Sequence, residues 1–311
     1  LRRSYDPSSL ADDRLTSEVY RGTVYSGSLL GNSESISALT RDEILDFYRQ
    51  HYALSGSALI AVGDLDPDAA LAEVEEIFGG TESGPPLPLP EIRPEPLPGI
   101  AVHIVDRPGA AQTELRLGHV GVARRHPDYV ALGLLNTLLG GKFTSRINLN
   151  LREEHAFTYG ASTRFVGRLG PGPFLVGAAV ATESTGAAAR EVLKELSRIR
   201  EELVEPEEIE DTRNYMIGVF PYTVQTIADL AKRLEILAVY GLPDNYYDGY
   251  IPRLEAIDRE DLRRVAQIHL DPEHIAIVAV GPAEVLEPQL DGLGTLKVWS
   301  RTEPAPAGTA V

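Results

Sequence analysis

The strongest constraint on the fold is a segment that occurs twice in the sequence. Residues 39–64 read LTRDEILDFYRQHYALSGSALIAVGD, and residues 257–282 read IDREDLRRVAQIHLDPEHIAIVAVGP. The two segments align without a gap at an offset of 218 positions, which places Arg41 opposite Arg259. A constant offset over such a span indicates two copies of one structural unit. The alternative is chance similarity, because many helices are followed by a buried strand.

Each copy is predicted to be a helix followed by a buried strand. In the first copy, Thr40 followed three residues later by Glu43 is typical of a capping box at a helix N-terminus, and the apolar residues 58–63 predict the strand. A unit of this length places the start of the second copy near Gly99 and that of the first about 119 residues before this chain begins. We therefore expect an exposed sheet edge and apolar surface on residues 1–80, unless another segment or chain covers them.

A proline-rich stretch divides the chain. Residues 81–99, TESGPPLPLPEIRPEPLPG, contain seven prolines, which exclude a helix or a central strand and favour an extended spacer. We predict four parts: the C-terminal part of a first unit at 1–80, a linker at 81–99, a second unit at 100–290 and a tail at 291–311. Further strands are predicted at 101–106, 112–120, 174–182 and 275–280, helices at 7–22 and 186–203, and a loop at 23–38.

Composition excludes several functional classes. The formal charge of −17 and the pI near 4.8 argue against nucleic acid or an anionic membrane as the main partner. The chain has no cysteine, so disulfides, thiol catalysis and cysteine-ligated zinc are impossible. No apolar run approaches the length of a membrane span. We therefore expect a soluble chain without a transmembrane segment, in a compartment that the sequence leaves open.

A zinc site is not predicted within this chain. No two histidines lie four residues apart, so neither H-E-x-x-H nor H-x-x-E-H occurs. We interpret His51 and His269, at equivalent positions of the repeat and at predicted helix ends, as structural. His103 and His119 lie in predicted strands and could meet in space, but two histidines are fewer than the three ligands of a catalytic zinc. No metal ligand and no catalytic residue is therefore assigned.

The stretch 139–166, LGGKFTSRINLNLREEHAFTYGASTRFV, predicts a helix that turns into a strand near Tyr159. Arg152 and Tyr159 flank this corner. A guanidinium and a phenol hydroxyl are both donors suited to a peptide carbonyl or a developing negative charge. The alternative is that Arg152 pairs with Glu153 or Glu154 on the surface while Tyr159 packs in a core.

Taken together, these segments resemble the pitrilysin/insulinase family of zinc metallopeptidases, which includes the mitochondrial processing peptidases. The resemblance covers nearly all of residues 5–290. It is carried by Glu34-Ser35-Ile36, Leu39-Thr40-Arg41-Asp42-Glu43, Phe47-Tyr48, His51-Tyr52, Val62-Gly63-Asp64, Leu139-Gly140-Gly141, Ser145-Arg146, Leu151-Arg152-Glu153-Glu154, Thr158-Tyr159 and Tyr240-Gly241-Leu242-Pro243.

The resemblance implies an α+β fold of tandem duplicated metallopeptidase-like α/β units, with mixed, mainly antiparallel sheets flanked by helices and the first unit incomplete. It also implies peptide-bond hydrolysis in a cleft between two units. The family's H-x-x-E-H motif and a further glutamate ligand would fall before Leu1. Zinc would then belong to the complete enzyme or to a partner subunit and would activate water there. Arg152 and Tyr159 match the family's substrate-binding arginine and tyrosine in spacing and context.

Three functional hypotheses follow from this resemblance. The chain is the peptide-binding part of a zinc metallopeptidase that lacks the zinc ligands, or a non-catalytic subunit of a heteromeric peptidase, or a structural member like the cytochrome bc1 core proteins. The first two imply a peptide substrate and a zinc-bearing segment or subunit of the same family, in a homo- or heterodimer. We expect this chain alone to bind no catalytic zinc and to hydrolyse no peptide.

Overall fold

The computed structural model describes residues 6–81, 84 and 90–300. These residues form two compact units. The first comprises the described parts of Leu1–Leu30, Ile92–Ile217 and Tyr247–Val311, and the second comprises those of Gly31–Glu91 and Gly218–Tyr246. Residues 6–30 thus belong to the same compact unit as residues 92–217. The two compact units are defined by contacts and do not show where one repeat ends and the next begins. The predicted division of the chain at the linker 81–99 therefore stays a prediction.

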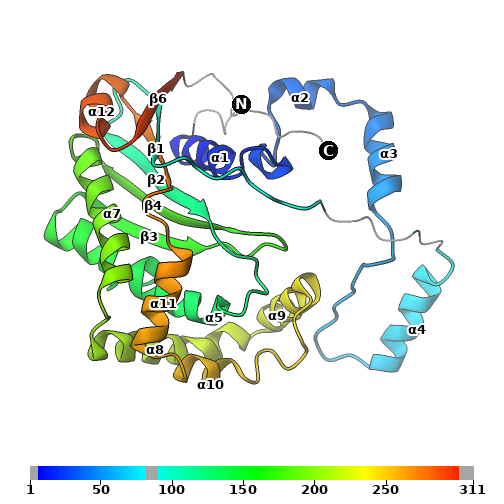
Figure 1. The fold of residues 1–311 in the computed structure, drawn as a ribbon. Coiled ribbons are helices and arrows are strands. Elements are labelled where there is room, and N and C mark those ends of the chain that lie inside the picture. Colours follow the sequence, from blue (N-terminus) through cyan, green and yellow to red (C-terminus); the bar gives the residue numbers. More distant parts are fainter. Residues whose placement is uncertain (1–5, 82–83, 85–89, 301–311) are drawn as a thin grey trace. The chain divides into compact units, whose positions relative to one another are not determined.

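The first unit contains a mixed six-stranded sheet with the strand order β3-β4-β2-β5-β1-β6 (Figure 1). Strand β1 pairs in parallel with β5 and β6, whereas the pairs β5–β2, β2–β4 and β4–β3 are antiparallel. The predicted mixed, mainly antiparallel sheet is therefore confirmed. The predicted tail is wrong for residues 295–300, because they form β6 beside β1; residues 301–311 lie outside the described part. The strands are β1 (Ala101–Asp106), β2 (Gln112–Val120), β3 (Thr158–Phe165), β4 (Pro173–Ala181), β5 (Ala276–Gly281) and β6 (Thr295–Ser300).

Helices cover both faces of this sheet. Figure 1 shows α1 on one face and α7 and α11 on the other. Consequently β5 is buried along its whole length: Ile277 and Ala279 join the larger core, and Val278 and Val280 join the core beneath α1. The helices of this unit in the described residues are α1 (Pro7–Val19), α5 (Tyr129–Asn136), α6 (Arg146–Asn148), α7 (Thr185–Glu201), α8 (Pro206–Val219, of which the last two residues belong to the second unit), α10 (Tyr250–Glu255), α11 (Arg259–His269) and α12 (Ala283–Leu290).

A buried polar cluster joins α1 to strands β1 and β6. The Trp299 ring lies between two cations, with the Arg14 guanidinium carbon 3.6 Å and the Lys297 ammonium 3.4 Å from its centroid. The indole N–H donates to Nδ1 of His103 at 3.0 Å, which requires this nitrogen to be unprotonated. The other ring nitrogen of His103 lies 3.5 Å from a carboxylate oxygen of Glu18. Side chains from three separate segments therefore depend on a neutral imidazole.

We expect the free energy of unfolding to fall by about 2 kcal/mol between pH 7 and pH 5 because of His103. The unfolded chain protonates this imidazole near its ordinary pKa of 6.5, whereas burial, aided by the nearby Arg14 and Lys297 charges, lowers its pKa in the folded state to about 4. The unfolded state binds more protons between these values, so stability is lost as the pH falls through that window. Burial raises the pKa of Glu18, which opposes this loss.

Urea unfolding at both pH values, followed by the fluorescence of the single tryptophan, measures the effect. The control is His103→Gln, which keeps a hydrogen-bond acceptor for the indole but does not titrate. Comparing the two proteins also cancels the contribution of His119, whose pKa burial lowers as well. The variant should lose at least about 1 kcal/mol less than the parent chain; equal losses would contradict the assignment.

The second unit is helical in its described part. It contains α2 (Ser33–Ala38), α3 (Arg41–His51), α4 (Pro67–Phe78), α9 (Ile227–Tyr240) and the 3₁₀ turn Phe220–Val224. The capping box of Thr40 with Glu43 is confirmed. The predicted loop at 23–38 is wrong where α2 forms, because Asn32 and Ser35 build a second capping box.

The buried strand predicted at residues 58–63 is also wrong. These residues form no strand and are largely exposed, with Leu59 exposed by 68%. The physical reason is that a strand needs a neighbour to take its backbone hydrogen bonds. Every described strand of this chain belongs to the sheet of the first unit. The exposed apolar surface expected on residues 1–80 is present on α3, where Ile44, Phe47 and Tyr48 are exposed.

Candidate functional site

The predicted helix-to-strand corner is present and is built from short helical pieces. After α5 come a π-helical turn (Thr137–Gly141), α6 and a second π-helical turn (Leu149–Glu154), and then β3 begins. Gly140 packs directly against β3: a Cβ on it would lie 2.5 to 2.6 Å from three atoms of Thr163, one of them the backbone nitrogen. The hydroxyl of Thr163 in turn donates to Oδ1 of Asn136 at 2.9 Å. Only glycine allows so close an approach.

One buried side chain joins the two arms of the corner. Asn148 donates from Nδ2 to the Phe143 carbonyl at 2.6 Å and accepts at Oδ1 from the Ala161 backbone N–H at 2.9 Å. The first bond holds the segment before α6, and the second holds β3 just beyond Tyr159. The sequence contained no signal for this role, because Asn148 is separated from its partner on β3 by a loop whose path the sequence does not show.

Arg152 lies on the helical arm. Its guanidinium carbon lies 4.2 Å from the centroid of the Phe143 ring, and its Nη1 lies 3.2 Å from a carboxylate oxygen of Glu153. The Glu153 side chain is half exposed, and exposed ion pairs contribute little to stability. The surface pairing that the sequence left open is therefore present, but it is a weak restraint that a bound ligand can replace.

Tyr159 lies on the strand arm at an irregularity of β3. The register between β3 and β4 shifts between Thr158 and Ala161. Within that bulge the Thr158 hydroxyl donates to the Ala179 carbonyl at 2.6 Å and accepts from the Gly160 backbone N–H at 3.1 Å. Bulges re-aim side chains, and here Tyr159 is exposed by 89%. The alternative in which Tyr159 packs in a core is wrong. Among the described residues no hydrogen bond joins Tyr159 to Arg152, and Asn148 links the segments that carry them.

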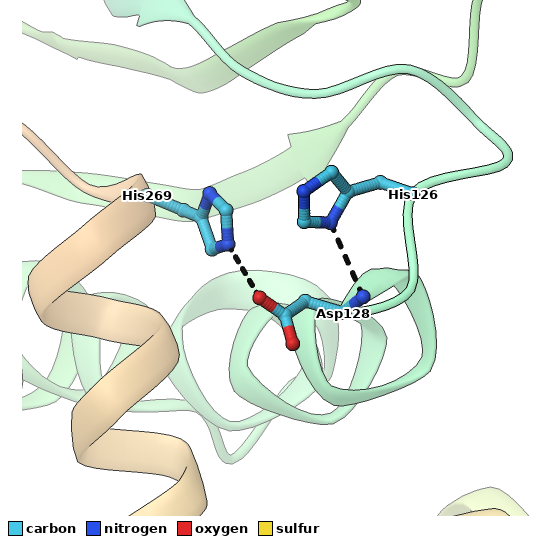
Figure 2. A group of neighbouring side chains, drawn as sticks. All are labelled: His126, Asp128 and His269. Atoms are coloured by element: carbon cyan, nitrogen blue, oxygen red, sulfur yellow. Dashed lines mark hydrogen bonds and ion pairs between the residues drawn. The ribbon is translucent and has the colours of Figure 1, made fainter.

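A separate cluster forms where the loop before α5 meets the end of α11. Figure 2 shows His126, Asp128 and His269 pointing toward one another. Nε2 of His269 lies 2.8 Å from Oδ2 of Asp128, and the Asp128 backbone N–H donates to Nδ1 of His126 at 3.2 Å. The Arg264 guanidinium donates hydrogen bonds to both carboxylate oxygens of Asp128, at 2.9 and 3.2 Å. The hydrogen bonds from Arg264, helped by His269, lower the pKa of Asp128 to about 2.

The cluster does not have the chemistry of a catalytic zinc site. In the described part of the chain, His126, Asp128 and His269 are the one group of three residues that could hold a metal ion. Both oxygens of Asp128 accept hydrogen bonds from the Arg264 guanidinium, whose positive charge disfavours a second cation at this carboxylate. A catalytic zinc needs three ligands and an open position, and these residues do not fit it. The hydrogen bonds of Asp128 join the loop before α5 to the end of α11, and the interpretation of His269 as structural stays a prediction.

The two strand histidines do not meet. β5 lies between β1, which carries His103, and β2, which carries His119. His103 bonds Trp299, and Nε2 of His119 accepts from the Asp271 backbone N–H at 3.2 Å. The sequence alone did not reveal their separation, because the strand order is set by pairing between distant segments.

The fold that carries the helix-to-strand corner, with this sheet and the helices on both of its faces, is also found in known proteins. Residues 38–216 match the family described as peptidase M16 inactive domain, over more than half of the chain. The chain belongs to this family. The crystal structure of a peptidase M16 inactive domain from Pseudomonas fluorescens superimposes on this chain with a TM-score of 0.81 at 25% identity. The match covers 90% of this chain and 67% of the Pseudomonas fluorescens chain. A protease from Helicobacter pylori shares the fold, with a TM-score of 0.76 at 19% identity, covering 88% and 70% of the two chains.

The curated relatives of the M16 chain carry names from proteolysis. An uncharacterized zinc protease of Streptomyces coelicolor is 24% identical over 270 residues, which are 84% of this chain and 58% of that protein. The human mitochondrial-processing peptidase subunit beta is 24% identical over 308 residues, 93% of this chain and 60% of that protein. The M16 chain thus spans about three fifths of the length of these relatives. Among its described residues, no helix combines the length and the apolar character needed to cross a membrane.

Proposed function

We propose that the M16 chain supplies the peptide-binding half of a zinc-dependent metallopeptidase and that a polypeptide outside residues 1–311 supplies the zinc ligands. Support for zinc comes from relatives that are named zinc proteases. Support for a peptidase of more than one subunit comes from a relative that is named as subunit beta of a processing peptidase. Within the chain, no described group of residues fits such a metal. This supports the proposal that the zinc chemistry lies outside the chain.

The observation that carries the proposal is the display of Tyr159 on a bulge of an edge strand. An exposed phenol on a bulge can donate a hydrogen bond to a ligand at the sheet edge. Arg152, which rests on the Phe143 ring, adds a fork of N–H donors on the other arm of the corner. We assign to this pair the binding of a peptide backbone: each donor would hold a carbonyl oxygen of the substrate near the bond to be cut.

The test is hydrolysis of a quenched fluorescent peptide by the chain together with the polypeptide from the same organism that carries H-x-x-E-H. Tyr159→Phe removes one donor and should lower kcat/KM by about 100- to 1000-fold, because the loss of one donor of this kind costs about 2.7 to 4 kcal/mol of activation free energy. Arg152→Lys keeps the charge but not the fork and should lower the rate in the same direction.

The matched control is Tyr222→Phe, the same change at another exposed tyrosine, which should leave the rate unchanged. An unchanged rate for Tyr159→Phe would contradict a substrate-binding role and would favour a purely structural member of the family. Hydrolysis by the pure chain without the second polypeptide would contradict the division of labour.

A further inference from the structure

We propose that a hollow on the sheet face covered by α1 is a subsite for an acidic side chain of the peptide substrate and that Arg164 determines this preference. The hollow lies over β4, between β2 and β3, and all its lining residues belong to the first unit. Gly160, which lines it, directly follows Tyr159 along β3. That the occupant is part of a peptide rests on the proposed function of Tyr159, whereas the acidic preference rests on the charges of the hollow.

The hollow exists because β4 carries small residues where its neighbours carry larger ones. Gly177 on β4 pairs with Arg116 on β2 and with Ser162 on β3, so these three residues form one row across the sheet. Paired residues of neighbouring strands share a face, and the missing side chain of Gly177 leaves a gap between the other two. The adjoining rows pair Ala179 with Glu114, and Leu175 with Arg164.

The size of the hollow favours a single side chain as its occupant. Its volume is about 230 Å³. Pockets that bind small molecules or cofactors usually measure about 300 to 1,000 Å³, so this hollow is too small for most of them. It is also open above the sheet, where an extended peptide can pass and insert one side chain.

The β2 wall of the hollow already has its own charge partners. The Arg116 guanidinium donates from Nε to Asp12 at 2.8 Å, from Nη1 to Glu114 at 2.9 Å and from Nη2 to the Ser8 hydroxyl at 2.7 Å. The Arg116 side chain is only 11% exposed. Two carboxylates therefore neutralise this arginine, and the β2 wall offers no uncompensated positive charge to a ligand.

The β3 wall, in contrast, has donors without partners. Ser162 and Arg164 lie two positions apart on β3 and so point to the same face of the sheet. Both are exposed, and within the described part of the chain no hydrogen bond or ion pair engages either side chain. A guanidinium and a hydroxyl are donors that suit a carboxylate. An acidic side chain in the hollow would therefore satisfy this wall, whereas a lysine would be repelled by Arg164.

The spacing along β3 predicts which substrate residue enters the hollow. Ser162 and Arg164 follow Tyr159 by three and five positions. An extended peptide that runs along β3 has the same rise as the strand, about 3.3 Å per residue. We therefore expect the acidic residue about three to five positions from the carbonyl that Tyr159 would hold.

The experiment measures peptide binding to the full chain, labelled with ¹⁵N at its glycines, by nuclear magnetic resonance. The probes are short capped alanine peptides with one central glutamate, glutamine or lysine, at millimolar concentration. The glutamate peptide should shift the amide resonances of Gly160 and Gly177 and bind about 10-fold more tightly than the glutamine peptide, because hydrogen bonds between charged groups are the stronger ones. Acetate, which has the carboxylate but no peptide backbone, should bind more weakly than the glutamate peptide.

Two variants test the residues that form the subsite. Arg164→Glu should reverse the preference, so that the lysine peptide binds more tightly than the glutamate peptide. Gly177→Val should fill the hollow and abolish binding. A Cβ at this position would lie 3.5 Å from the Arg116 side chain, an ordinary contact, and a β-branched residue suits a strand, so the variant should fold.

The matched control is Arg263→Glu, the same change on α11, which packs against the opposite face of the sheet. No hydrogen bond or ion pair engages the Arg263 side chain within the described residues. This variant should bind the three peptides in the same order of affinity as the parent chain.

Four outcomes would overturn the proposal: no shift at Gly160 and Gly177, equal affinity for the glutamate and lysine peptides, an unchanged order in Arg164→Glu, or acetate binding as tightly as the glutamate peptide. None of these readouts uses hydrolysis. If binding follows the expected order while Tyr159→Phe leaves hydrolysis unchanged, the acidic subsite is retained and the proposed role of Tyr159 is rejected. If Tyr159→Phe lowers hydrolysis while the peptides do not differ in affinity, the subsite alone is rejected.

Discussion

Replacing Trp299 by alanine is expected to lower the free energy of unfolding by about 4 kcal/mol, because truncating a buried tryptophan costs about 3 to 5 kcal/mol. The ring is 8% exposed and packs in the core beneath α1. Its removal also takes away the ring that Arg14 and Lys297 flank and the N–H that His103 accepts. Two cations and an imidazole are then left facing a cavity, and the attachment of α1 to β1 and β6 is weakened.

Urea unfolding followed by circular dichroism measures this loss, since the variant has no tryptophan to observe. Val298→Ala serves as the control on the same strand, because Val298 is 39% exposed and should cost less than about 1 kcal/mol. Trp299→Phe keeps an aromatic face for the two cations but loses the N–H, and should lie between the parent and Trp299→Ala. A loss below about 1 kcal/mol for Trp299→Ala would contradict the role of this cluster.

Gly140→Ala is expected to destabilise the chain by about 3 kcal/mol, at the upper end of the usual cost of overpacking. The added methyl group would overlap the Thr163 side chain and its backbone nitrogen. Because a backbone atom is involved, β3 or the π-helical turn has to move. The corner that carries Arg152 and Tyr159 then opens, so peptide hydrolysis by the reconstituted pair should fall with stability.

The test compares Gly140→Ala with Gly133→Ala in α5. A Cβ at Gly133 meets only the tip of Met216, at an ordinary 3.9 Å, so this helical substitution should stabilise the chain by about 0.5 to 1 kcal/mol. Thr163→Ala in the Gly140→Ala background removes the side-chain overlap but not that with the backbone, and should restore only part of the stability. Full restoration would show that the backbone contact is unimportant.

Local signals predicted a large part of the fold. Strands β1 and β2 have the predicted limits, because apolar and β-branched runs between turn residues favour an extended chain. Helix α3 begins at the predicted cap Thr40, because a side-chain acceptor satisfies a free N–H group of the first turn. The family followed from the motifs in combination.

The support of the candidate site could not be predicted from the sequence. Asn148 and the bulge at Tyr159 depend on how the helical arm meets β3, and the His126–Asp128–His269 cluster depends on how α11 meets the loop before α5. The pairing of Arg152 with Tyr159 rested on spacing and resemblance, and its role in binding remains a proposal. Spacing along the chain shows which residues can come near each other only within one element; between elements, packing decides.

The repeated segment shows where the two kinds of information separate. The sequence determined that residues 39–64 and 257–282 have one pattern, and helices α3 and α11 have matching limits because caps and helix propensity act locally. Only the tertiary structure decided that residues 276–281 form a strand while residues 58–63 do not. A helix satisfies its backbone hydrogen bonds within itself, whereas a strand is stable only where neighbouring strands satisfy them.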